Sequence, residues 1–433
     1  MHAASDYYRH SAGSLPPRPP AHGRIDAPCV VVGGGFAGLN TAYGLVERGL
    51  PGVVLLEAAT LGHGASGRNG GFVFAGHSRG EAALLAEQGP QRARRLHGRT
   101  RAAVGLIRER SERLGIDCDR VDGGVLWANW FRDPAVLESR RRLLAEHFET
   151  HWQPVAGDEL AGLLHTRRYS GALREADAFH FHPLKYARGL AAAFEARGGV
   201  LHEHSPALRL RRAGAEWQVE TATGAVLRTP QLVLACGGYL AGLVPSVDAA
   251  VLPIATYVMV TEPLGARAAE SVATTAAVYD TRFAFDYYRL LPDTRLLWGG
   301  RISVRDRDPA AVQELLRRDL RRVFPQLVEV RIDYAWSGLM SYARHEMPQI
   351  GQIEPGLWVA QAFGGHGVAP TTVAGELLAA AIAEGDSGWR DYAPYGLVSA
   401  MKPWGYAGAQ ATYAWLQAKD AWKDWREGRA GGR

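Results

Sequence analysis

Cysteine is scarce in this sequence. The chain has 433 residues and 3 cysteines, which stand far apart at Cys29, Cys118 and Cys236, with no C-x-x-C pair among them. An odd number of widely spaced cysteines gives neither a disulfide framework nor the ligand spacing of a structural zinc site. His180 and His182 alternate along one segment, but no carboxylate or cysteine stands beside them at the spacing of metal ligands. We therefore expect no metal site.

Lysine is also scarce. It occurs only at Lys185, Lys402, Lys419 and Lys423, so the formal net charge of +5 depends on arginine. The positive excess is mild, and no dense basic run is interleaved with aromatic residues, as a nucleic-acid-binding surface would require. The sequence therefore predicts no nucleic-acid partner, and the basic balance is compatible with an anionic ligand.

Long hydrophobic runs are missing as well. No uninterrupted apolar stretch is long enough to span a bilayer, and residues 1–24 lack the apolar region of a secretory signal. Hydrophobic residues make up 47% of the chain and charged residues 21%, which is typical of a globular protein. We expect a cytoplasmic protein without stable membrane insertion, long enough for two interleaved domains.

Glycine, in contrast, is abundant and patterned. The stretch from Cys29 to Gly38 reads C-V-V-V-G-G-G-F-A-G, an apolar strand that runs into a turn and then a helix. Gly33, Gly35 and Gly38 hold the G-x-G-x-x-G positions, which allow a tight turn, close approach of a pyrophosphate and close packing of helix on strand. The phosphates would lie at the helix N-terminus, where free N–H groups and the helix dipole favour negative charge.

The residues that follow supply the βαβ context that this motif needs. Apolar residues recur at helical spacing from Leu39 to Val46, Gly49 is placed to end the helix, and Val53 to Leu56 forms a second apolar strand. Glu57 closes that strand 24 residues after Gly33. This is close to the offset of about 20 residues at which a carboxylate accepts hydrogen bonds from a ribose. A dinucleotide site is therefore predicted, with a chance glycine turn in an ordinary βαβ unit as the alternative.

A second loop of small residues distinguishes a flavin site from a nicotinamide site. Residues 64–71 read G-A-S-G-R-N-G-G. A flavin lying extended along its domain needs such close backbone approach and donors for its phosphates and ring, whereas a nicotinamide dehydrogenase has no evident use for it. With this motif the sequence resembles the D-amino acid oxidase superfamily of FAD enzymes, and within it the branch of gamma-glutamylputrescine oxidase and glycine or sarcosine oxidase. The resemblance covers nearly the whole chain.

This resemblance implies an α/β fold, with a discontinuous Rossmann-type FAD-binding domain and a second, α+β substrate domain built on a mixed β-sheet. The expected FAD-binding segments are 25–78, 150–240 and 345–400. The expected substrate-binding segments, with their helical cover, are 79–149 and 241–344. A C-terminal helical tail would occupy residues 401–433.

The fingerprint, the second loop and the resemblance together give a set of expected FAD contacts. They are Gly33, Gly35, Phe36, Ala37, Gly38, Glu57, Ala65, Ser66, Arg68, Asn69, Gly70, Gly71, Ala207, Ala235, Gly237, Trp336, Gly364, Gly365, His366, Gly367 and Val368. No cysteine stands beside Gly364–Val368 or Met347–Gly351 to attach the flavin, so FAD should be bound noncovalently. The helix expected from Ala369 to Ala383 would direct its N–H groups at the flavin.

Three residues are the candidates for catalysis: His366, Tyr288 and Arg289. His366 stands between glycines at the expected flavin edge, where it would donate a hydrogen bond to the negative edge of reduced flavin. Tyr287 and Tyr288 lie on a predicted strand, whose alternation sends one side chain to the cavity and the other to the core; the resemblance favours Tyr288 or its neighbour as a substrate contact. Arg289 could pair with a substrate carboxylate or form a structural ion pair.

The resemblance implies oxidation of a C–N bond in a small-molecule amine or amino acid, by hydride transfer to flavin and hydrolysis of the imine. A gamma-glutamylated amine or an N-alkylated amino acid would be the substrate, with oxygen reduced to hydrogen peroxide. Sarcosine-type oxidases place a lysine on the strand that corresponds to Leu296 to Gly300, and this chain has none there. An amino acid dehydrogenase that passes electrons to quinone or another carrier is therefore an alternative, and a non-catalytic flavoprotein is another.

The end of the chain is rich in tryptophan. Trp415, Ala418, Trp422 and Trp425 recur at helical spacing. We expect a terminal helix docked on the FAD domain, with a helix at a membrane interface as the alternative. The protein is expected to be a monomer or a homodimer.

Overall fold

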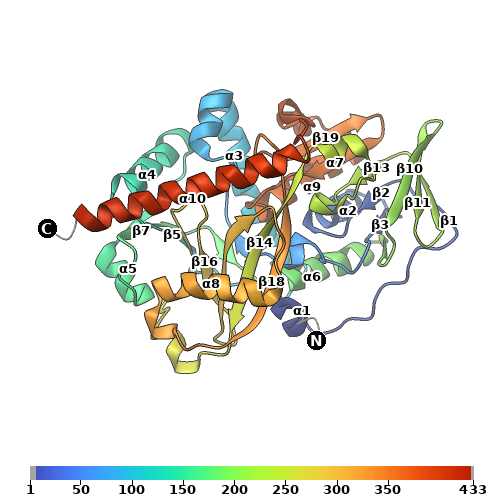
Figure 1. The fold of residues 1–433 in the computed structure, drawn as a ribbon. Helices are drawn as coiled ribbons and strands as arrows, with labels where there is room; N and C mark the ends of the chain where they lie inside the picture. The colour runs from blue at the N-terminus through green and yellow to red at the C-terminus, as the bar shows by residue number, and fades with distance from the viewer. Residues whose placement is uncertain (1–5, 431–433) are drawn as a thin grey trace.

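The computed structural model describes residues 6–430 and has an α/β architecture with several mixed sheets, as the sequence predicts (Figure 1). A six-stranded sheet has the order β19-β20-β13-β2-β3-β9. Its strands are β2 (Val30–Val32), β3 (Val54–Leu56), β9 (Val200–His202), β13 (Leu232–Leu234), β19 (Gln349–Glu354) and β20 (Leu357–Gln361). All neighbours pair in parallel except β19 with β20, and β2, β3, β13 and β20 are buried throughout because both faces of the sheet are covered.

Four helices cover one face of this sheet. They are α2 (Phe36–Glu47), α3 (Glu81–Arg113), α6 (Pro183–Glu195) and α9 (Val368–Glu384). The long α3 is interrupted at Gly89, just before Pro90. Its later part lies against α9 and reaches α2 through hydrogen bonds of Arg110 and Arg113. There Arg110 is buried and binds Asn40 and Glu376. Although we expected residues 79–149 beside the substrate-binding segments, this helix packs on the helices that cover the six-stranded sheet.

A four-stranded sheet covers the other face. Its order is β1-β12-β11-β10, with β1 (Arg24–Asp26), β10 (Ala207–Ala213), β11 (Glu216–Thr221) and β12 (Val226–Thr229). Its apolar side chains, among them Val219 and Leu227, pack with Val30 and Val54 of the six-stranded sheet. The Rossmann-type domain is thus a layered unit built from segments far apart in the chain.

The second part of the molecule is an eight-stranded sheet of order β18-β14-β17-β16-β15-β5-β7-β6. Its strands are β5 (Val125–Ala128), β6 (Gln153–Ala156), β7 (Gly171–Glu175), β14 (Leu252–Thr261), β15 (Ala277–Asp280), β16 (Tyr287–Leu290), β17 (Leu296–Ser303) and β18 (Ile332–Tyr342). All pairs are antiparallel except β15 with β5, so the sheet is mixed, and α8 (Pro309–Val323) packs on one face. Residues 153–156 and 171–175, which we expected in the FAD-binding domain, belong to this sheet because β7 pairs with β5 and β6 pairs with β7.

The remaining elements connect these layers. They are α1 (Tyr7–Ser11), α4 (Ala135–Phe148), α5 (Gly157–Leu164), α7 (Pro245–Ala249), α10 (Trp404–Ala430), the β4 (Phe72–Val73) and β8 (Phe179–His180) pair, and the short 3-10 turns η1 (Ala65–Gly67), η2 (Gly237–Tyr239), η3 (Gly265–Ala268), η4 (Pro325–Leu327), η5 (Gly388–Asp391) and η6 (Ala393–Tyr395). Across residues 6–430, no helix combines the length and the hydropathy that a membrane span requires.

The C-terminal helix docks elsewhere than expected. Helix α10 runs along the part of the molecule that holds the eight-stranded sheet, where Asp424 binds Arg168 at 2.6 Å and Lys423 lies 4.3 Å from the ring of Phe131 (Figure 1). The expectation of docking on the FAD domain was wrong because these partners lie beside β5 to β7. Residues 431–433 of the expected tail lie outside the described residues.

Candidate functional site

A cavity of about 700 Å³ lies where the carboxyl ends of the parallel strands meet the eight-stranded sheet. Its lining comes from the turn after β2, the loop at 64–70, β16 to β18 and the turn before α9. The volume falls in the range of about 300 to 1,000 Å³ that is typical of small-molecule and cofactor sites. Every predicted FAD contact except Gly38, Gly71 and Trp336 lines it.

The first glycine turn forms one end of the cavity. Gly33 has φ +114°, and a Cβ there would lie 2.6 Å from the carbonyl oxygen of Ala235, so the position requires glycine. A Cβ at Gly38 would overlap the Gly33 carbonyl, which explains why Gly38 packs under the turn and does not line the cavity. Gly35 is the N-cap of α2 and offers no capping side chain, so this helix N-terminus can accept an anion.

Glu57 supports the same turn from β3. One carboxylate oxygen accepts a hydrogen bond from the backbone N–H of Gly34 at 2.8 Å, and the other accepts from the N–H of Ala59 at 2.8 Å. Burial raises the pKa of this carboxyl, and the two backbone donors oppose that shift. Glu57 lines the cavity, so its oxygens also lie where ribose hydroxyls can bind.

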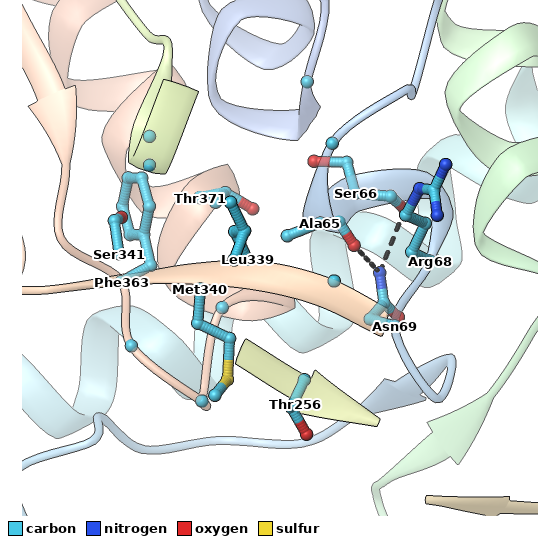
Figure 2. Close-up of a pocket in the computed structure, with 18 of the residues that line it drawn as sticks. Ala65, Ser66, Arg68, Asn69, Thr256, Leu339, Met340, Ser341, Phe363 and Thr371 are labelled. Carbon is cyan, nitrogen blue, oxygen red and sulfur yellow. Dashed lines mark hydrogen bonds between the residues drawn. The ribbon is translucent and has the colours of Figure 1, made fainter. Parts of the chain in front are cut away.

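The second loop is held together by its own side chains. Asn69 donates to the carbonyls of Ala65 and Ser66 at 3.1 and 2.9 Å (Figure 2), and Ser66 Oγ accepts from the N–H of Phe36 at 2.8 Å. Arg68 donates to the carbonyl of His63 at 2.8 Å. The loop is therefore fixed to the N-terminus of α2 before any ligand binds.

Two of the expected contacts act from behind this loop. Trp336 is buried and donates from Nε1 to the carbonyl of Arg68 at 3.0 Å, so it braces the loop and does not line the cavity. Gly71 packs against the carbonyl of Phe181. The structure corrects both from direct FAD contacts to supports.

The turn before α9 closes the opposite wall. The N–H of Gly364 donates to the carbonyl of Ser341 and the N–H of Gly365 donates to the Tyr342 hydroxyl, at 2.8 and 2.9 Å. Gly367 caps α9 without a side chain, and Thr371 of the first turn also lines the cavity (Figure 2). The positive end of α9 therefore faces the cavity, as the sequence predicts.

His366 is bound differently from our expectation. Its Nε2 lies 2.9 Å from the carbonyl of Ala75, and because a carbonyl only accepts, Nε2 carries the proton. Burial lowers the pKa of His366 to about 4, so the ring is neutral at pH 7 and Nδ1 is an acceptor. Because the Nε2 proton is engaged by the Ala75 carbonyl, a hydrogen bond from His366 to the flavin would need the protonated ring or the loss of this contact, and it stays a prediction.

The three residues 287–289 separate as strand alternation requires. Tyr287 lines the cavity, and Gly299 opposite it leaves room for the ring, because a Cβ there would overlap it. Tyr288 points to the core, where it stacks on Trp298 at 4.7 Å, so it cannot touch a ligand. Tyr288, which we named as a catalytic candidate, is therefore corrected to a core residue, and its neighbour Tyr287 lies in the cavity.

Arg289 also lies outside the lining of the cavity. It is 1% exposed and donates to the carbonyls of Gly70 and Phe181 at 2.7 and 2.8 Å. It also lies 3.2 Å from the Tyr8 hydroxyl. The structure corrects its role from substrate carboxylate partner to a brace between β16 and the second glycine loop.

The cavity also has an aromatic wall, of which the sequence pattern indicated only Tyr287. The wall consists of Phe74, Tyr279, Phe283, Phe285, Tyr287 and Tyr413. Phe74 stacks on Tyr279 at 5.4 Å, and Phe285 lies 5.6 Å from Tyr279. Alternation along β15 and β16 could have identified Tyr279, whereas Tyr413 comes from a helix that we expected on the FAD domain.

The charged side chains near this wall are already paired. Arg68 and Arg301 are the arginines in the lining of the cavity, within the described part of the chain. Arg301 makes two hydrogen bonds to the Asp319 carboxylate, at 2.8 and 2.6 Å, and Glu346 pairs with Arg79 at 3.1 Å. No lining arginine is thus left without a protein partner.

The two cavity-facing helix N-termini, the glycine cradles and the carboxylate of Glu57 fit a dinucleotide with an extended shape. Comparison with known proteins agrees. The family described as FAD dependent oxidoreductase matches residues 29–381. The chain is 35% identical to Gamma-glutamylputrescine oxidoreductase of Escherichia coli, over 87% of this chain and 88% of that protein. It is 34% identical to Probable oxidoreductase OrdL of Haemophilus influenzae, over 81% and 82%.

Solved structures share the fold. Glycine oxidase from Geobacillus kaustophilus superposes with a TM-score of 0.71 at 22% identity, covering 86% of this chain and 99% of that one. L-proline dehydrogenase from P. horikoshii gives 0.71 at 18% identity, covering 86% and 98%. At these identities the likeness concerns the fold alone.

Proposed function

The chain belongs to the family of FAD-dependent oxidoreductases, and from this premise we propose that it oxidises the carbon–nitrogen bond of an amine. FAD is its cofactor, and when bound it supplies a ring that accepts a hydride from the carbon next to the amine nitrogen. The imine formed would then be hydrolysed by water.

The chain's own residues divide the work of holding the cofactor. The N-terminus of α2 would hold the pyrophosphate, Glu57 would accept from the ribose hydroxyls, and the N-terminus of α9 would stabilise negative charge on the reduced ring. His366 holds the loop at Ala75 against the turn before α9 and stays neutral. With a pKa of about 4, His366 is a weak base, and the substrate ammonium would lose its proton to water.

The aromatic wall is the observation that carries the proposal. An alkyl amine chain gains from burial against aromatic rings, and a cationic end gains further from their faces. A free amino acid also brings a carboxylate, which in a buried site needs an unpaired cation. Since Arg68 and Arg301 are both bound to protein acceptors, the cavity favours an amine whose reacting end lacks a carboxylate.

A gamma-glutamylated amine meets this condition because its carboxylate stands far from the reacting carbon. The name of the Escherichia coli relative supports this choice over an N-alkylated amino acid. Because β17 lacks the lysine that sarcosine-type oxidases place there, oxygen and a quinone-type carrier are both candidate electron acceptors. Noncovalent attachment of FAD, a cytoplasmic location and a monomeric or dimeric state stay predictions.

Anaerobic mixing tests the proposal. The yellow protein should lose its flavin absorbance with gamma-glutamylputrescine faster than with glycine or sarcosine at the same concentration. Reoxidation in air with formation of peroxide would identify an oxidase, and reoxidation only by a quinone or dye would identify a dehydrogenase. Bleaching by glycine or sarcosine but not by the gamma-glutamylated amine would refute the substrate class, and no bleaching by any of them would refute amine oxidation.

A further inference from the structure

The C-terminal helix takes part in the cavity. Tyr413 of α10 is half-buried and lines the cavity together with Phe283, and the two ring centroids lie 5.8 Å apart. Burial raises the pKa of the Tyr413 hydroxyl, with a further contribution from Tyr342, whose own hydroxyl accepts from the N–H of Gly365. Tyr413 lines the same cavity as the turn before α9, although it stands more than forty residues later in the chain.

Polar contacts fix α10 in this place. Asp420 accepts a hydrogen bond from the N–H of Phe283 at 2.8 Å, which joins the helix to the loop that carries the partner ring. Gln410 Oε1 accepts from Ser303 Oγ and from the N–H of Val304, both at 3.3 Å, one turn before Tyr413. These contacts lie on both sides of Tyr413 along α10, so they fix the position of this part of the helix against the loop that carries Phe283.

The loop that carries Phe283 is itself rigid. Arg282 binds Asp280 at 2.6 Å and Asp286 at 2.5 Å, and its guanidinium lies 3.6 Å from the ring centroid of Trp130. The loop is therefore anchored to the eight-stranded sheet at both ends. Phe283 has 37% of its surface exposed, which places the ring pair at the boundary between cavity and solvent.

We propose that Tyr413 and Phe283 form the outer wall of the substrate end of the cavity, and that this pair selects the amines that bind. The proposal rests on the proposed function for the identity of the substrate class. Two aromatic rings at the mouth would contact the part of the amine farthest from the reacting carbon and would shield the cavity from water. The C-terminal helix is then part of the substrate site.

The test compares Tyr413→Ala with Tyr413→Phe and Trp415→Ala in the full-length, FAD-loaded protein. Trp415 lies on the same helix, is 63% exposed and does not line the cavity, so it controls for damage to α10. With gamma-glutamylputrescine, Tyr413→Ala should raise KM between about 3- and 10-fold, the effect of losing one aromatic contact, with the limiting rate of flavin reduction unchanged. Trp415→Ala should keep the wild-type KM, and Tyr413→Phe, which keeps the ring, should raise KM less than Tyr413→Ala does.

A second readout does not depend on amine oxidation. Anaerobic bleaching by dithionite should be faster in Tyr413→Ala and in Phe283→Ala than in Trp415→Ala, because the wall no longer limits entry. Faster dithionite bleaching without any amine turnover would uphold the wall and refute the proposed function. Amine turnover with wild-type KM and wild-type dithionite rates in both alanine variants would overturn the wall while leaving the proposed function intact.

Discussion

Replacing Arg289 by methionine tests whether this residue is structural. The guanidinium donates to the carbonyls of Gly70 and Phe181 and contacts the Tyr8 hydroxyl, and the side chain is buried. Within residues 6–430 no carboxylate lies within 4.0 Å of it. Methionine keeps most of the side-chain volume, so the change removes hydrogen bonds without opening a large cavity.

The expected loss of unfolding free energy is about 3 kcal/mol. Leaving the carbonyls of Gly70 and Phe181 buried without donors costs about 1 to 3 kcal/mol each. Removing a desolvated charge that has no anionic partner returns part of this cost. Arg289→Lys should recover only part of the loss, because one ammonium cannot reproduce the planar fork that reaches both carbonyls.

Urea unfolding at saturating FAD, followed by tryptophan fluorescence, measures this loss. Arg209→Met is the matched control, since Arg209 is 72% exposed and its change should cost less than about 0.5 kcal/mol. The reasoning is refuted if Arg289→Met unfolds like the wild type and instead raises KM only for substrates that carry a carboxylate near the amine. That result would make Arg289 a substrate ligand.

Three further changes test the cavity. Gly33→Ala should weaken FAD binding by at least about 100-fold, because its Cβ would meet the Ala235 carbonyl. The control Gly49→Ala, at φ +81° with no atom near the new Cβ, should keep FAD. Ultrafiltration followed by measurement of the released flavin compares the two variants. Ser66→Ala should cost about 1 kcal/mol in urea unfolding, since the N–H of Phe36 loses its acceptor. Burial lowers the pKa of His180 to about 3, so between pH 3 and 6.5 the unfolded chain binds a proton that the folded chain does not, and stability falls as the pH falls through that window. Urea titration should therefore show that the wild type loses about 1 kcal/mol of unfolding free energy relative to His180→Gln between pH 7 and 5.5.

Local glycine patterns explain why so much of the cofactor site could be predicted. In the turns at Gly33 and Gly364 the backbone itself lines the cavity, and the residue types that such backbone requires are visible in the sequence. Trp336 was misplaced for the opposite reason. Its role depends on a hydrogen bond to the Arg68 carbonyl from a strand that follows much later in the chain, and no local pattern reports such a contact.

The pair Tyr287 and Tyr288 shows what alternation can and cannot decide. Period-two geometry requires one ring in the cavity and one in the core, and the structure has that arrangement. The choice between the two depends on which face of β16 meets Trp298 and which meets Gly299, and this follows from the register with β17. Register is set by pairing across the sheet, so the sequence of β16 alone leaves both assignments open.

Helix α10 shows how an amphipathic pattern can indicate the wrong face. The tryptophans at helical spacing suggested that their stripe would be buried, yet Trp415 and Trp422 are 63% and 61% exposed. The contacts with the rest of the molecule come from Tyr413, Asp420 and Asp424. Tyr413 meets the ring of Phe283, Asp420 accepts from the N–H of Phe283, and Asp424 binds Arg168. Hydrophobicity predicts burial only where apolar area is the dominant free-energy term. On α10 directional hydrogen bonds and one ring pair decide the orientation, and for this reason the same helix can carry a substrate contact on a face that its sequence marks as polar.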